Sequence, residues 1–252
     1  MRVLFILAFL ASASISLATP IKRQTPQRGA PTGNAHTIFT KVFVHENALS
    51  GQNPNQIKNI IASEFDSVIN QAFTRDPSLG ARRLSFTPEV EFITESQFPV
   101  RGAGSNQILR SFGELIRSRA VDLGRNDMAM IVARFREPIG GGGEVAGLSP
   151  VPGQLRKCAG LGLRDTVVIN PGRGNNLIGD TATHELGHYF GAPHDGQGAA
   201  ASCSQVGNIM SPVLNTGAGA GRGNGAGAWS SCSSQLIQRH IRLLESQNCF
   251  SS

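Results

Sequence analysis

The segment His184-Glu185-Leu186-Gly187-His188 combines two imidazoles and a carboxylate at a spacing suited to metal chemistry. Residues four apart lie on one face of a helix, so His184 and His188 can direct ring nitrogens at the same ion. Zinc accepts such nitrogens at about 2.0–2.1 Å. Glu185 can act on a zinc-bound water without itself being a ligand. The pattern therefore predicts one catalytic Zn²⁺ ion, held in part by His184 and His188, with Glu185 as the general base.

A third candidate ligand, His194, follows the pair after a glycine and a proline. A straight helix would carry His194 away from the metal, but Gly191 can adopt a positive φ and turn the chain back. Pro193 prevents the helix from continuing. Three neutral histidines leave the fourth zinc position open to water, as in catalytic rather than structural sites. The sequence thus predicts Gly191 as the helix hinge and His194 as the third metal ligand.

Two rival interpretations of this motif can be stated. A zinc-stabilised structural domain would need a fourth protein ligand, and Asp195 is the obvious candidate. Its position next to His194 makes simultaneous ligation strained, so we expect Asp195 to steady the turn by hydrogen bonds. A binding or effector protein could also use a metallopeptidase scaffold without catalysis, because fold does not imply function. The presence of Glu185 together with all three histidines favours an enzyme.

Hydrophobic periodicity predicts the elements that position these residues. Strands are predicted at 37–45, 82–94, 128–135 and 166–170, with a short edge strand at 144–149 after the four-glycine turn at 140–143. Helices are predicted from Asn53-Pro54 to about Phe73 and at 106–121, 176–190 and 234–246. Pro88 favours an edge or a break for the second strand. Strands alternating with helices indicate an α/β layer with a largely parallel sheet, followed by an irregular half in which 216–228 is a low-complexity loop.

Met210 follows His194 within the stretch Asn208-Ile209-Met210-Ser211-Pro212. The extended histidine motif followed by a Met-turn resembles the signature of the metzincin metallopeptidases. Asp195 directly after His194 is similar to the adamalysin/reprolysin group, which includes the ADAM and ADAMTS catalytic domains. The resemblance covers about residues 37–249 and is strongest at 180–210. Outside the motif it rests on three segments: 127–135 (DMAMIVARF), Val145-Ala146-Gly147-Leu148 and Trp229-Ser230-Ser231-Cys232-Ser233.

The resemblance implies a metzincin-like catalytic domain at 37–252. Its fold would be a mixed, mostly parallel sheet with an antiparallel edge strand, a zinc helix at the cleft and an irregular C-terminal subdomain ending in a helix. Its activity would be hydrolysis of peptide bonds in polypeptide substrates, by Glu185-assisted attack of a zinc-bound water. Substrate would add to the edge strand at Gly147 and Leu148 by main-chain hydrogen bonds. Val213 and Leu214 would line the pocket for the side chain past the scissile bond.

All four cysteines, Cys158, Cys203, Cys232 and Cys249, lie in the second half of the chain. An even number in an exported chain suggests two disulfides, with three possible pairings. Loop lengths do not choose among them, because long loops stabilise by similar amounts, about 3–5 kcal/mol. The resemblance implies the pairs Cys158–Cys249 and Cys203–Cys232.

The N-terminal residues 1–18 have the pattern of a secretory signal peptide. Arg2 precedes an unbroken apolar run at 3–10, and Ser16-Leu17-Ala18 is a small-x-small cleavage site. The run is shorter than the roughly 20 residues that span a bilayer, so we expect secretion without a membrane anchor. Residues 19–36 would be a short extended leader, and the sequence leaves open whether it is trimmed after Lys22-Arg23.

The formal charge of +6 gives no reason to expect a nucleic-acid partner. Residues 1–23 hold three basic and no acidic residues, so the remainder carries 6 − 3 = +3. That remainder has no dense Lys/Arg run. The chain has no N-x-S/T acceptor, so N-glycosylation is not expected. We expect a monomer.

Overall fold

The computed structural model describes residues 2–4, 35–49, 51–80, 84–118, 122–124, 126–139, 143–153, 155, 158, 166–171, 178–215 and 228–250. Most of the predicted signal peptide and leader therefore lies outside the described residues. The same holds for 140–142 of the predicted four-glycine turn and for 216–227 of the predicted loop.

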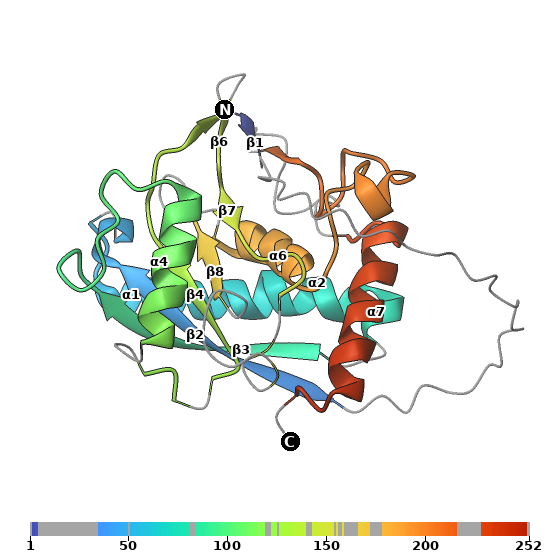
Figure 1. The fold of residues 1–252 in the computed structure, drawn as a ribbon, viewed down its shortest axis with the longest axis horizontal. Coiled ribbons are helices and arrows are strands. Elements are labelled where there is room, and N and C mark those ends of the chain that lie inside the picture. Colours follow the sequence, from blue (N-terminus) through green and yellow to red (C-terminus); the bar gives the residue numbers. More distant parts are fainter. Residues whose placement is uncertain are drawn as a thin grey trace, which may run out of the picture.

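A five-stranded sheet runs through the molecule (Figure 1). Its strands, in spatial order, are β3 (Leu84–Ile93), β2 (His36–His45), β4 (Met128–Val132), β8 (Thr166–Ile169) and β7 (Gly147–Leu148). The first four are parallel, and β7 runs antiparallel to β8. The predicted mixed sheet with an antiparallel edge strand is confirmed. Pro88 lies on β3, the opposite edge strand, where a residue without an amide hydrogen is tolerated.

Helices pack on both faces of this sheet. On one face, α1 (Pro54–Glu64), the π-helical stretch η2 (Phe65–Ile69) and α2 (Asn70–Arg75) follow one another without a break. They occupy the span predicted as a single helix, although the π-helical stretch was not foreseen. Asn53 and Gln56 close a capping box and Pro54 begins the helix, which explains why it starts there. Shorter helices among the described residues are η1 (Glu46–Ala48), α3 (Pro77–Gly80) and η5 (Gly198–Ala200).

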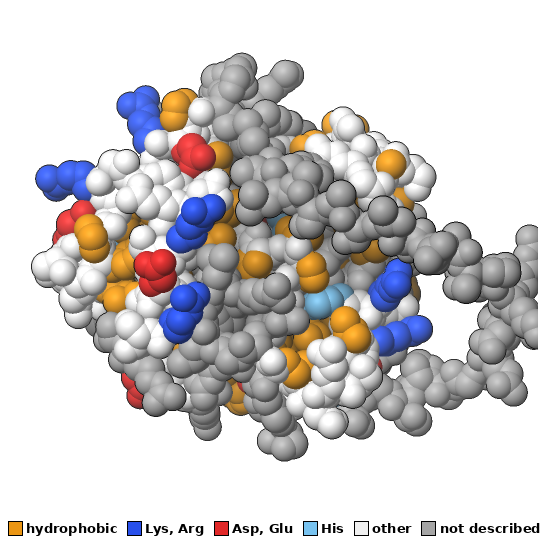
Figure 2. Space-filling model, viewed as in Figure 1, with side chains coloured by type: hydrophobic (Ala, Val, Ile, Leu, Met, Phe, Trp, Pro, Cys, Tyr) orange, Lys and Arg blue, Asp and Glu red, His pale blue; other side chains and the backbone are white. Residues whose placement is uncertain are grey.

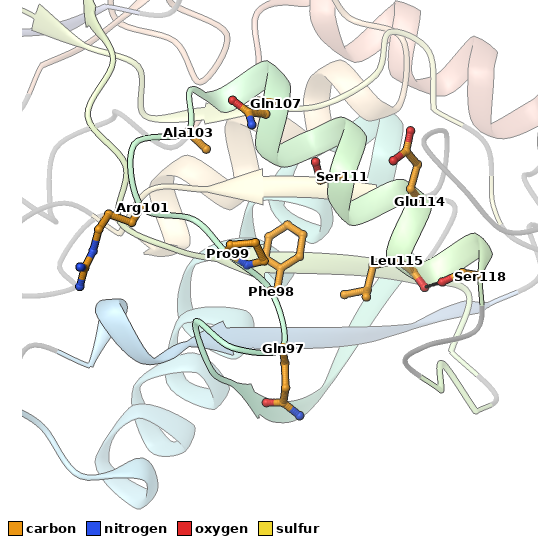
Figure 3. A pocket seen from close by; sticks show the side chains of 10 residues that line it. All are labelled: Gln97, Phe98, Pro99, Arg101, Ala103, Gln107, Ser111, Glu114, Leu115 and Ser118. Carbon is orange, nitrogen blue, oxygen red and sulfur yellow. Dashed lines mark hydrogen bonds between the residues drawn. The ribbon is translucent and has the colours of Figure 1, made fainter.

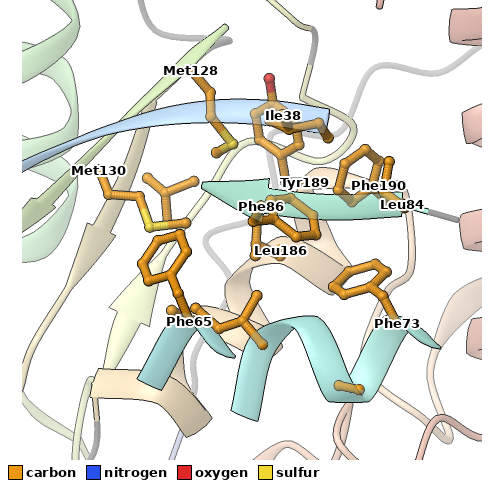
Figure 4. Close-up of a cluster of buried hydrophobic side chains, with 14 of the residues drawn as sticks. Ile38, Phe65, Phe73, Leu84, Phe86, Met128, Met130, Leu186, Tyr189 and Phe190 are labelled. Atoms are coloured by element: carbon orange, nitrogen blue, oxygen red, sulfur yellow. The ribbon is translucent and has the colours of Figure 1, made fainter. Parts of the chain in front are cut away.

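The opposite face is covered by α4 (Ser105–Arg117), and the strands alternate their side chains between the two layers. On β4, Met128 and Met130 belong to the larger core, and Ala129 and Ile131 face α4. α6 (Ile178–Tyr189), the helix of the histidine motif, packs in the larger core, where Figure 4 shows Leu186 among residues of the sheet and of α2.

Phe73 connects three parts of this larger core. Its ring centroid lies 5.0 Å from that of Phe86 on β3 and 5.9 Å from that of Phe190, which directly follows α6. It also lies 5.1 Å from the ring of Trp229, which precedes the last helix. Aromatic pairs at such separations add to the stabilisation gained by burial alone. The histidine helix is therefore held on a rigid support.

Two short antiparallel pairs complete the described strands. β5 (Pro138–Ile139) pairs with β6 (Gly143–Glu144) on either side of residues 140–142. β1 (Arg2–Leu4) pairs with β9 (Val213–Asn215), in a register that joins residue 3 to residue 214. β1 also lies next to β6 (Figure 1). An extended N-terminal segment thus runs along the strand that follows the predicted Met-turn.

The last helix, α7 (Ser231–Ser246), begins three residues before its predicted start. The Ser230 side chain caps it by accepting a hydrogen bond from the Ser233 amide. Disulfides join Cys158 to Cys249 beyond its end and Cys203 to Cys232 in its first turn, with Cα–Cα distances of 5.3 and 6.2 Å. This is the pairing that the resemblance implied. Both bonds fasten α7 to segments that flank the histidine motif.

Within the described part of the chain, no helix has the length and apolarity needed to cross a membrane. On the face drawn in Figure 2, Lys and Arg side chains alternate with Asp and Glu over the α4 side, and two basic side chains lie near each other over the α7 side. That face has no continuous basic field among the residues described.

Candidate active site

The three histidines of the motif converge on one point. The Nε2 atoms of His184, His188 and His194 lie 3.1–3.2 Å from one another, and all three side chains are buried. Ligands placed tetrahedrally at zinc distance from one ion lie about 3.3 Å apart. The triangle therefore has the size that a zinc ion requires.

Main-chain carbonyl groups determine which ring nitrogens are available. His184 Nδ1 donates to the carbonyl of Ile209 at 2.6 Å, and His188 Nδ1 donates to that of Ala192 at 2.7 Å. A neutral imidazole with its proton on Nδ1 has a lone pair on Nε2. Lone pairs that converge on one point cannot hydrogen-bond one another, so a cation is the partner that fits them. The hydrogen bonds from Nδ1 to the carbonyl groups are of the kind that orients histidine ligands around a metal.

Burial also keeps these imidazoles neutral. Loss of hydration lowers the pKa of His188 to about 3 and that of His194 to about 4. It holds the pKa of His184 well below its usual value, and the neighbouring imidazoles act in the same direction. Neutral imidazole is the form that coordinates zinc, so the three rings are in the ligand form at neutral pH.

The turn that returns His194 to the motif depends on Gly191. Gly191 has φ +90°, a conformation that side-chain-bearing residues rarely adopt. Its amide donates to the carbonyl of His188 at 2.8 Å, and the amide of Ala192 donates to that of Gly187 at 2.9 Å. These two bonds form a Schellman motif, which satisfies carbonyls at the helix end. The structure thus places a helix hinge where the sequence predicted one.

Glu185 lies against the edge strand β7. Its side chain is 1% exposed, and neither carboxylate oxygen has a hydrogen-bond partner among the described residues. A Cβ atom on Gly147 would lie 2.7 Å from both Cγ and Oε1 of Glu185, so only glycine permits this approach. Burial raises the pKa of Glu185 to about 8. A cation held by the histidines would act in the opposite direction.

Met210 lies beneath the histidine helix. Its side chain is fully buried, and a Cβ atom on Gly187 would collide with its sulfur and with the ring of Trp229. Its carbonyl accepts the amide of Asp195, and the carbonyl before it orients His184. The predicted Met-turn therefore contacts the site through both its backbone and its side chain. Gly187 was not singled out from the sequence, and the small residue within the motif was the available signal.

Asp195 joins the turn after His194 to the start of α7. Its Oδ1 atom accepts hydrogen bonds from the hydroxyl groups of Ser230 at 2.6 Å and Ser233 at 2.9 Å. Among the described residues, the group of side chains arranged to hold a metal contains the three histidines without Asp195. The expected turn-stabilising role of Asp195 agrees with these bonds.

Of the four predicted substrate-contact residues, Gly147 lies against Glu185. Gly147 and Leu148 form β7, the last strand of the sheet, and the Leu148 side chain packs toward the α4-side core. A strand added at that edge would therefore pair with the main-chain N–H and C=O groups of β7. Val213 and Leu214 lie in β9, where they pair with β1.

A separate surface pocket of about 440 Å³ lies between α4 and the loop before it (Figure 3). None of its lining residues belongs to the histidine motif or to β7, so it is not part of the candidate active site. The lining residues are Gln97, Phe98, Pro99, Arg101, Ala103, Gln107, Ser111, Glu114, Leu115 and Ser118.

Comparison with known proteins agrees with this geometry. The family model Reprolysin_5, described as metallo-peptidase family M12, matches residues 39–222. A mouse (Mus musculus) protein, "A disintegrin and metalloproteinase with thrombospondin motifs 18", is 34% identical over 123 residues, which cover 46% of this chain and 9% of the relative. The mouse protein with thrombospondin motifs 16 is 39% identical over 98 residues, covering 39% of this chain and 7% of the relative.

The chain spans less than a tenth of the length of these curated relatives. The family match, in contrast, extends over most of the chain, from within β2 past β9, and includes the whole histidine motif. The chain therefore belongs to metallo-peptidase family M12, as an adamalysin/reprolysin-type metzincin.

Proposed function

We propose that this protein is a secreted endopeptidase that uses one zinc ion to cleave peptide bonds in protein substrates. One observation carries the proposal: three histidine Nε2 atoms, 3.1–3.2 Å apart, lie beside the buried Glu185 carboxylate at the free edge of a sheet. Ligands, base and substrate-binding edge are thus provided by neighbouring parts of the chain.

His184, His188 and His194 would hold the ion. When bound, zinc supplies Lewis acidity that polarises a carbonyl group and makes water acidic enough to attack near neutral pH. Glu185 is not a ligand in this arrangement. Its carboxylate accepts the proton of the attacking water and passes it to the amine that leaves when the peptide bond breaks.

The substrate would bind as an extended strand. Among the described strands, β7 has only β8 as a neighbour, so its outer main-chain groups would be able to pair with a polypeptide. The antiparallel pairing of β1 with β9 supports the view that β9 can also accept an extended segment. Val213 and Leu214 in β9 would border the pocket for the residue after the scissile bond. This arrangement favours polypeptides over small esters as substrates.

The mature protein would begin after Ala18, and cleavage there would remove β1. We expect export to give a secreted chain whose N-terminal residue is Thr19, or Gln24 if the leader is trimmed after Arg23. Intact-mass measurement of the protein recovered from the medium distinguishes these two forms. Recovery only inside the cell, with Met1 retained, would contradict secretion.

Chelation tests the proposed activity directly. The purified secreted protein should cleave casein or an internally quenched peptide. A zinc chelator should abolish cleavage, because it removes the ion that the three histidines would hold. Adding back Zn²⁺ should restore the rate. A chelator-resistant rate would contradict the zinc mechanism. Stoichiometric zinc without cleavage of any substrate would favour a non-catalytic scaffold.

A further inference from the structure

We propose that Ser149 is a positioning residue, which holds the general base Glu185 in register with the substrate-binding edge strand. This inference rests on the proposed endopeptidase function, because it concerns the distance between the base and a peptide bound along β7. Ser149 directly follows β7 and is 5% exposed, so its hydroxyl group must find its partner within the protein.

That partner belongs to the catalytic helix. Ser149 Oγ donates a hydrogen bond of 2.8 Å to the main-chain carbonyl of Glu185, in a fully buried setting. The bond joins the strand expected to bind substrate to the residue expected to activate water. No third element mediates between them.

A second contact reaches the same residue from the same face of the strand. Side chains two apart on an extended strand point to the same side, so Gly147 and Ser149 face α6 while Leu148 packs toward α4. Gly147 lies directly under the Glu185 carboxyl group, too close to allow a Cβ atom. The strand therefore contacts Glu185 twice, at its carboxyl group through Gly147 and at its backbone through Ser149.

These contacts matter because the Glu185 carboxylate accepts no hydrogen bond of ordinary geometry from a described residue. The Ser149 hydroxyl is near enough to lower the pKa of this carboxyl group, against the larger, opposite effect of burial. The place of the carboxyl group is set by packing against Gly147 and by the position of the Glu185 backbone, which Ser149 fixes. A bound peptide pairs with the main chain of the same strand. Its scissile bond is thereby held at a constant distance from the base.

The chain after Ser149 continues along the helix and reinforces this register. Four residues later, the amide of Gly153 donates to the carbonyl of Tyr189 at 2.8 Å, four residues after Glu185. His240 Nε2 on α7 donates to the Gly153 carbonyl at 3.0 Å. The segment 149–153 thus follows the last turn of α6 and is fastened at both ends, so the edge strand cannot slide past the base.

The test compares S149T with S149V, whose side chains have nearly the same shape but differ in the hydroxyl group. One hydrogen bond of this kind corresponds to about a threefold to tenfold effect. S149V should therefore lose about that factor in kcat per zinc-loaded chain, with KM within about twofold of the wild type, since the main chain of β7 still binds the peptide. S149T should retain most of the wild-type kcat. S149A provides the same loss without added bulk, in case the branched side chains disturb folding.

A readout independent of turnover is the position of Glu185 in crystal structures of the variants. In S149V and S149A the carboxyl group should move away from the Cα atom of Gly147, and in S149T it should stay. Equal kcat in S149T and S149V, or an unmoved Glu185 in S149A with wild-type kcat, would overturn the proposal. If the wild type cleaves no peptide but S149A still displaces Glu185, the positioning role stands and the endopeptidase function fails.

Discussion

Replacing Glu185 with glutamine should lower kcat by about 10²–10⁴-fold while one zinc ion per chain remains bound. Glutamine preserves the size of the side chain and its approach to Gly147 but cannot accept the proton of the attacking water. The three histidines are unchanged, and Glu185 is outside the group of residues arranged to hold the metal. The measurement is kcat on a quenched peptide, with zinc content determined on the same sample.

Stability separates a chemical role from a structural one. The Glu185 carboxylate is buried without a hydrogen-bond partner among the described residues, so replacing it with a neutral amide removes a desolvation cost. The melting temperature of E185Q should thus be equal to or above that of the wild type. E185D, which keeps a carboxylate on a shorter side chain, should retain more activity than E185Q. Normal proteolysis by E185Q would defeat the role assigned to Glu185.

The histidine motif could be interpreted from sequence because its chemistry is local. The spacing of His184 and His188 fixes their common face in any α-helix, and Gly191 followed by Pro193 permits a return of the chain. The largely parallel sheet was predictable for a similar reason, since β4 and β8 are short apolar runs between helices with their own 3.6-residue period, whereas the antiparallel edge strand was implied by the resemblance. Each of these inferences needs only neighbouring residues.

The features that could not be predicted from the sequence depend mostly on tertiary contacts between remote residues. The role of Ser149 depends on which carbonyl its hydroxyl meets, and that carbonyl belongs to a residue 36 positions away. The two disulfides follow from where the fold brings α7, so the residues alone left three pairings open. The earlier start of α7 is different, because the capping tendency of Ser230 was visible in the sequence. The β1–β9 pairing also joins remote segments.

Replacing His194 with alanine should weaken zinc binding by about 10²–10³-fold and abolish proteolysis at limiting zinc. Zinc binding to a complete four-ligand protein site is worth about 10–16 kcal/mol, so one ligand accounts for roughly 2.5–4 kcal/mol. His194 lies beyond the helix hinge, so its loss leaves the His184–His188 pair on α6 intact. Competition with a zinc-sensitive dye measures the affinity, and retained stoichiometric zinc at the wild-type affinity would break the three-histidine model.

D195N is the matched control, because it changes the adjacent residue and leaves all three histidines in place. The amide oxygen can still accept from Ser230 and Ser233, which hold Asp195 Oδ1 in the native protein. We expect zinc affinity within about threefold of the wild type, since a change in a group outside the ligand set costs less than loss of a ligand. If D195N lost as much zinc affinity as H194A, the result would instead indicate that Asp195 is a fourth ligand. The fourth position would then be closed to water, and the site would be structural rather than catalytic.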